Sequence, residues 1–149
     1  MAMKRLLILP VLTLLMICQH AQAQQSQDFG EFTVHYSALN TNFLTPQVAQ
    51  AYDIQRSSSR AMINITVIKR STDQPDTPVK ASVIANARNL TGQNREIEIR
   101  EIADSDNAIY YIGELSVRNL EMFNFTISVT PEDSDQVLDL SFRQQFYTE

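Results

Sequence analysis

The segment from His35 to Arg60 concentrates the side chains that could perform recognition chemistry. It carries aromatic rings, side-chain amides and two guanidinium groups, which are common at binding surfaces. Guanidinium groups form paired hydrogen bonds with carboxylates or phosphates. We therefore predict a binding site in this segment, formed by His35, Asn42, Phe43, Tyr52, Arg56 and Arg60.

The same segment also permits a purely structural interpretation. Thr45 and Pro46 are typical of a helix start, and they predict a helix of about two turns up to Asp53. This helix could plug one open end of a sandwich while the two arginines hold acidic loops. Its core would then be Phe43, Leu44, Val48 and Tyr52.

Catalytic groups are few. Cys18 and His20 lie in an N-terminal leader, so His35 is the only imidazole expected in the mature chain. An enzyme, or an accessory subunit of one, could pair His35 with a carboxylate such as Asp53 or Glu31. We expect instead no catalytic residues and a non-enzymatic interaction module. A related possibility is a sheet edge that accepts a strand from a partner.

Two acidic loops raise the question of a metal site. Residues 104–107 and 132–135 supply clustered oxygen ligands of the kind that calcium prefers. Neither loop has the glycine and final glutamate of an EF-hand, and the same residue types favour turns. We expect no metal site and no cofactor.

Residues 1 to 23 have the three parts of a secretory signal peptide. A basic start at Lys4 and Arg5 precedes an apolar run from Leu6 to Ile17, and Ala21 to Ala23 form a small-x-small end. The run is shorter than the roughly 20 residues that cross a bilayer. We expect cleavage after Ala23, a periplasmic product and no membrane span. A lipidated Cys18 is the alternative, although the residue before it is bulky.

Charge and thiol content exclude several function classes. Removal of Lys4 and Arg5 with the leader leaves ten basic and seventeen acidic residues, a net charge of −7. Such a surface repels nucleic acid, which we exclude as a partner. The mature chain would have no thiol, so disulfides and cysteine zinc sites are excluded as well. The expected partner is a protein, a peptide or an envelope component.

Alternation of apolar and polar residues dominates the mature chain and predicts β-strands. We expect an all-β, immunoglobulin-like antiparallel sandwich of about seven strands, with one short helix between the first two. A small barrel is the competing fold. Residues 24–30 should form a flexible arm and residues 31–149 a single domain, with Ile65, Phe125 and Leu140 in its core. The expected strands are 32–38, 61–69, 79–87, 95–102, 109–117, 122–129 and 137–146.

Particular stretches of the chain resemble a known family. They are VHYSALNTNFL (34–44), PQVAQAY (46–52), RS (56–57) and RAMINI (60–65). These stretches are similar to an exported bacterial family called domain of unknown function 4426, and the resemblance extends over nearly the whole mature chain. It implies a small periplasmic β-sandwich protein of Gram-negative bacteria. The family has no assigned activity, so the resemblance supplies no site residue.

Overall fold

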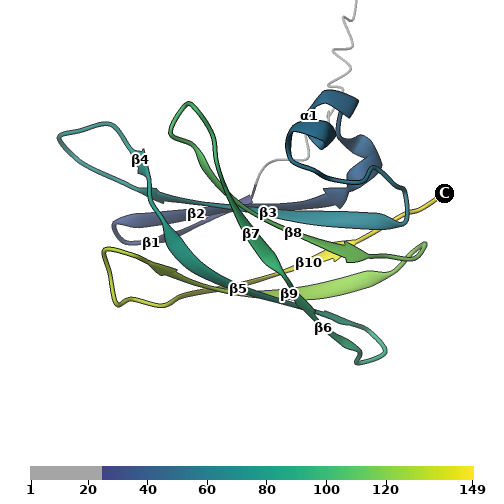
Figure 1. The fold of residues 1–149 in the computed structure, drawn as a ribbon. Coiled ribbons are helices and arrows are strands. Elements are labelled where there is room, and N and C mark those ends of the chain that lie inside the picture. Colours follow the sequence, from purple (N-terminus) through teal and green to yellow (C-terminus); the bar gives the residue numbers. More distant parts are fainter. Residues whose placement is uncertain (1–24) are drawn as a thin grey trace, which may run out of the picture.

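The computed structural model describes residues 25–149, which form two antiparallel sheets packed face to face (Figure 1). The expected signal peptide lies outside these residues. The larger sheet has the order β1 (Gln25–Phe29), β2 (Phe32–Asn40), β3 (Arg60–Lys69), β8 (Ile109–Ser116) and β7 (Ile99–Ala103), with β4 (Thr77–Pro78) paired to β3. The smaller sheet has the order β10 (Leu138–Gln145), β9 (Met122–Pro131), β5 (Ala81–Asn89) and β6 (Asn94–Ile97). The predicted antiparallel sandwich is confirmed.

Alternate residues of the two sheets fill the space between them. Ile65 and Phe125 have no exposed surface and Leu140 is 5% exposed, so the three predicted core positions are confirmed. The Phe125 ring stacks on Phe142 with 4.8 Å between centroids. Complete burial of each such side chain stabilises the fold by about 1.5 to 3 kcal/mol.

The prediction of a flexible N-terminal arm over residues 24–30 is wrong for residues 25–29, which form the edge strand β1. The strand pairs with β2 in an antiparallel register that sets Gln25 opposite Tyr36. A two-residue turn at Gly30 and Glu31 joins the two strands, and Gly30 has a φ of 75° that suits glycine at this position. Most of β1 is exposed. Backbone pairing rather than side-chain burial therefore forms this strand, which hydrophobic periodicity does not reveal.

The prediction of a single strand over residues 95–102 is also wrong, because the chain passes from the smaller sheet to the larger one at Glu98. β6 pairs with β5 in the smaller sheet, whereas β7 pairs with β8 in the larger one. Ile97 and Ile99 occupy the two sides of this corner, and both pack in the common core. A corner of this kind keeps the alternating pattern of one continuous strand.

The predicted helix is present as α1 (Pro46–Ala51), after a short 3-10 turn, η1 (Thr41–Phe43). Thr45 caps α1, since its hydroxyl oxygen accepts a hydrogen bond from the Val48 N–H group at 3.3 Å. The helix lies outside the sandwich, over the larger sheet (Figure 1). No helix within residues 25–149 is both long enough and apolar enough to cross a membrane.

The interpretation in which α1 closes one open end of the sandwich is wrong. Phe43 is 75% exposed and Val48 is 39% exposed, so neither side chain is a core residue. The helix segment instead builds a second, smaller cluster on the outer face of the larger sheet. Its buried members are Ala49, Ile54, Met62 and Ile112.

Candidate functional site

A hollow of about 520 Å³ lies between the end of β2 and the end of β10, and we call it the β2–β10 groove. None of its lining residues has a carboxylate, ammonium or guanidinium group. Apolar and amide side chains therefore determine what the groove can bind. The lining residues are Ala38, Leu39, Asn40, Phe43, Leu44, Gln144, Gln145, Phe146 and Tyr147.

The groove begins where β1 stops. β1 pairs with β2 as far as Tyr36, and within residues 25–149 no strand pairs with residues 37–40 on that side. β10 is itself the edge strand of the smaller sheet. Next to β1 the sandwich interior is closed by the Tyr36 and Phe142 rings, whose centroids are 4.8 Å apart. The groove is thus a gap between two strand edges.

Asn40 ties the two walls of the groove together. Its side chain is buried, and Nδ2 donates to the backbone oxygens of Ser58 at 2.7 Å and Tyr147 at 3.1 Å. The C-terminal tail is also held by the Phe146 N–H group, which donates to the Glu121 backbone oxygen at 2.9 Å. These bonds fix the residues after β10 beside the end of β2.

Two aromatic side chains of the groove are open to solvent. Phe43 is 75% exposed and Tyr147 is 57% exposed, and they come from segments far apart in the sequence, η1 and the tail after β10. The Tyr147 hydroxyl donates to Gln145 Oε1 at 3.0 Å, which orients the ring. Exposed aromatic side chains of this kind supply large contact areas at protein interfaces.

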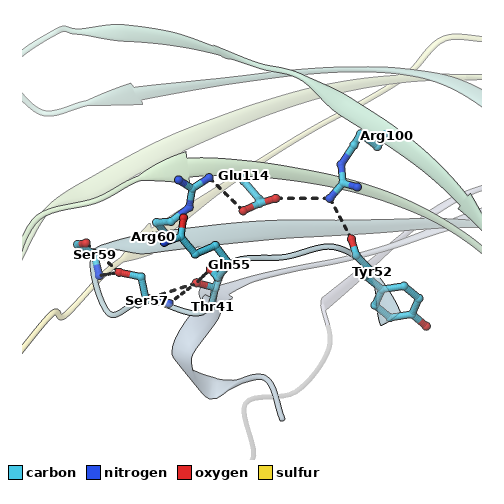
Figure 2. A network of polar contacts seen from close by, with 8 residues as sticks. All are labelled: Thr41, Tyr52, Gln55, Ser57, Ser59, Arg60, Arg100 and Glu114. Carbon is cyan, nitrogen blue, oxygen red and sulfur yellow. Dashed lines mark hydrogen bonds and ion pairs between the residues drawn. The ribbon is translucent and has the colours of Figure 1, made fainter. Parts of the chain in front are cut away.

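A buried hydroxyl holds the segment that carries Phe43. Thr41 has no exposed surface. Its hydroxyl donates to the Gln55 backbone oxygen at 2.8 Å and accepts from the Ser57 N–H group at 2.9 Å (Figure 2). The chain that returns from α1 is therefore fastened to the end of β2, directly before Phe43.

A charged network fastens the same segment to the outer face of the larger sheet. Glu114 on β8 accepts from Arg60 Nη2 at 3.2 Å and from Arg100 Nη2 at 3.4 Å (Figure 2). Arg100 Nη2 also donates to the Tyr52 backbone oxygen at 3.2 Å. Because both arginines are about two-fifths exposed, each ion pair stabilises the fold by at most about 1 kcal/mol.

The structure distributes the six predicted site residues over several places. Phe43 lines the groove. Arg56 Nη2 donates to the Asn42 backbone oxygen at 3.0 Å, so these two residues are brought together beside it. Arg60 is engaged by Glu114. His35 lies apart on the outer face of the larger sheet, opposite Ser26 on β1 and Thr66 on β3.

Tyr52 contributes to the outer cluster under α1. Its ring lies 6.2 Å from that of Tyr110, and burial raises its pKa, with a further contribution from the charge of Asp104. Through its backbone oxygen Tyr52 belongs to the same network as Arg60. Tyr52 thus helps to hold the segment 41–60 against the outer face of the larger sheet.

The alternative catalytic pairing is not seen within residues 25–149. No hydrogen bond or ion pair there joins His35 to a carboxylate. Asp53 lies in the turn after α1, and Glu31 lies in the turn after β1, where one of its oxygens is 3.9 Å from Lys69 Nζ. The same part of the chain contains no cluster of three or more potential metal ligands among His, Cys, Asp and Glu.

Sequence reasoning missed the half of the groove that comes from β10 and the tail. Nothing in the local pattern of Gln144 to Tyr147 indicates that they lie beside residues 38–40. One signal was available: Tyr147 follows the alternating strand as a large aromatic residue near the end of the chain. Another was Asn40, whose side-chain amide continues the alternating apolar positions 32 to 38.

The comparisons with known proteins agree with this fold. A crystal structure of a DUF4426 family protein from Pseudomonas aeruginosa PAO1 is 30% identical, covering 87% of this chain and 99% of that chain, with a TM-score of 0.72. FetP from uropathogenic Escherichia coli strain F11, expressed in the periplasm, is 9% identical, covering 85% of this chain and 95% of that chain, with a TM-score of 0.60. A copper-bound variant of the same FetP is 11% identical, covering 85% of this chain and 97% of that chain, with a TM-score of 0.57.

The two FetP structures share the fold alone with this chain, because their identity is so low. No curated protein matches the chain. The model of the family described as domain of unknown function (DUF4426) matches residues 26–149. The chain therefore belongs to the DUF4426 family.

Proposed function

We propose that this protein is a non-enzymatic interaction module of the periplasm that binds a polypeptide partner at the β2–β10 groove. The observation that carries the proposal is the pair of exposed aromatic side chains, Phe43 and Tyr147, at a hollow without charged lining. Folded proteins seldom expose large aromatic rings beside an apolar hollow unless a partner covers them.

Further exposed apolar residues at the same end of the sandwich support the proposal. Leu90 is 71% exposed and Leu120 is 60% exposed, in the turns after β5 and β8. Gln145 Nε2 donates to the Leu120 backbone oxygen at 3.1 Å, which places the Leu120 turn beside the tail. A partner larger than a short peptide would find additional apolar surface next to the groove.

The proposed compartment follows from the signal peptide predicted for residues 1 to 23. An acidic chain without thiols in its mature part suits an interaction module that folds after export. Membership of a family without assigned activity is compatible with such a role.

Affinity capture from a periplasmic extract tests the proposal. The bait is the chain without its leader, and the test variant is Phe43→Ala with Tyr147→Ala. We expect the wild type to retain one specific partner and the variant to lose it by about tenfold or more, because exposed interface aromatics often contribute 2 kcal/mol or more.

The matched control replaces two exposed apolar residues away from the groove, Ile84→Ala with Val137→Ala. Ile84 is 59% exposed and Val137 is 55% exposed, so this pair removes similar apolar surface. The control should capture the partner like the wild type. Equal loss in both double variants, or no partner at all for the wild type, would contradict the proposal.

A further inference from the structure

We infer that the β2–β10 groove binds an extended, uncharged and partly apolar segment of the partner, which adds to β2 as an antiparallel strand in line with β1. This inference rests on the proposed function and names the chemistry of the bound segment. It depends on three features of the described chain: the direction of the free backbone groups, the space in line with β1, and the absence of charge.

The backbone of β2 directs Ala38 toward the groove. The Arg70 N–H group donates to the Glu31 backbone oxygen at 2.7 Å, so the Glu31 oxygen points to the β3 side. Successive residues of a strand point their backbone groups to opposite sides. Phe32, Tyr36 and then Ala38 therefore point away from β3, to the side on which β1 pairs. Within residues 25–149 no strand pairs with Ala38 on this side, so among these residues both of its hydrogen-bonding groups face the groove unpaired.

Within residues 25–149, the part of β2 that no strand covers on this side has the dimensions of a short strand. Gln25, the first described residue of β1, lies opposite Tyr36. Residues 37–40 extend β2 beyond this pair by about 13 Å, at about 3.3 Å per residue. A strand that enters here and runs antiparallel to β2 follows the line of β1. Its length would be about four residues.

Charge distinguishes this edge from the edges at β1, β6, β7 and β10. Among the described residues, β1, β6 and β7 carry Asp28, Arg95 with Glu96, and Arg100 with Glu101, respectively. β10 carries Asp139 and Arg143. Charged residues on edge strands prevent pairing with other chains. The open stretch from Ser37 to Asn40 lacks this protection.

The lining defines the side chains that the bound segment presents. Side chains of a strand alternate between two faces. One face would meet Phe146 of the core between the sheets, and the other would meet Leu44, which packs against the outer cluster. Burial of a charge against these residues would be unfavourable, since no opposite charge lines the groove. The segment should therefore have apolar residues at alternate positions and no charge between them.

Capped heptapeptides are the probes for this inference. In each probe Val, Leu or Phe alternates with Thr, and a Lys at each end keeps the peptide soluble. Each peptide is titrated into the isotope-labelled chain without its leader. We expect the Ala38 and Asn40 amide signals to shift in nuclear magnetic resonance spectra and their hydrogen exchange to slow as the peptide binds.

A proline variant tests the role of the backbone. Ala38→Pro removes the N–H group that faces the groove and should weaken peptide binding by about tenfold or more. Ser26→Pro is the matched control, because Ser26 is paired with His35 and so directs its N–H group to the outer edge of β1, away from β2. Binding to the Ser26→Pro chain should equal binding to the wild type.

A variant of the peptide keeps the test valid if Ala38→Pro fails to fold. N-methylation of the central peptide amides removes the same hydrogen bonds from the ligand side, and it should abolish binding to the wild-type chain. Equal binding of the methylated peptide, or no shift at Ala38 with any probe up to about 1 mM, the weak end of specific recognition, would overturn strand addition. Capture that depends on Phe43 and Tyr147 would then still support the proposed function.

Discussion

Tyr111 shows how a single buried phenol couples this fold to pH. It is 2% exposed, donates to Glu101 Oε2 at 3.1 Å and accepts from the Ala81 N–H group at 2.7 Å. Burial, and to a smaller extent Glu101, raise its pKa from 10.0 to about 12, although the Ala81 bond acts in the opposite direction. The folded chain thus favours the neutral phenol, which joins the two sheets.

The raised pKa predicts a pH dependence of stability. The stabilisation by neutral Tyr111 is complete below pH 10 and is lost as the pH rises to about 12. Across this window we expect the free energy of unfolding to fall more steeply in the wild type than in Tyr111→Phe, by up to about 1.4 kcal/mol per pH unit. Urea unfolding at several alkaline pH values measures the slopes. Tyr147→Phe, which changes an exposed phenol, should keep the wild-type slope, and equal slopes in all three chains would contradict the account.

At the residue scale the sequence identified only one of the residues that line the groove. Phe43 was predicted to bind and does line the groove. The two interpretations of the sequence assigned Arg60 either to a ligand or to an acidic loop, whereas the structure pairs it with Glu114 on β8, 54 residues away in the chain. The type of a residue can be read from sequence, but its long-range partner cannot. Asn40 and Ala38 were missed for the same reason.

At the scale of elements, the corner between β6 and β7 depends on the absence of a side chain at Gly113. A Cβ atom there would lie 2.8 Å from Ile99 Cδ1 and 3.2 Å from the Glu98 backbone oxygen, and it would also contact Ile97 Cγ2. β8 therefore offers a flat surface over which the chain crosses from one sheet to the other.

This packing predicts that Gly113→Ala destabilises the protein. We expect a loss of about 1 to 3 kcal/mol in the free energy of unfolding, because the added methyl group has no space in a packed corner. Ser116→Ala, on the same strand at an exposed position, should change it by less than about 0.5 kcal/mol. Denaturant unfolding measures both values. A Gly113→Ala chain as stable as the control would show that the corner tolerates a side chain.

Two elements could not be predicted from hydrophobic periodicity. β1 contains one apolar residue, Phe29, and forms by backbone pairing to β2 across the Gly30 turn. The corner at Glu98 preserves the alternation of Ile97 and Ile99, so the sequence reads as one strand. In contrast, α1 was predictable, because Thr45 and Pro46 are local signals for a helix start.

At the scale of the whole molecule, the sandwich and its core followed from the spacing of apolar residues, whereas the order of strands did not. The groove exists because β10, the edge strand of the smaller sheet, faces the part of β2 that extends past the end of β1 in the larger sheet, about 100 residues away in the chain. Asn40 Nδ2 and the Tyr147 backbone oxygen mark this contact at a sequence separation of 107 residues. No local pattern contains that information.

We expect a partner to cover the groove when the protein is in its natural compartment. A photo-crosslinking amino acid placed at one position reports which protein lies against that position in living cells. Phe43 is suited to this experiment because it is 75% exposed and lines the groove. Ile84, 59% exposed on β5, serves as the control position.

The most direct test of the central claim is therefore crosslinking in the periplasm from position 43, followed by mass spectrometry of the adduct. We predict one dominant adduct from position 43 and its absence from position 84. The crosslinked residue of the partner should lie in an uncharged segment with alternating apolar residues. No adduct from position 43, or the same adducts from both positions, would contradict the claim that the β2–β10 groove is the binding site.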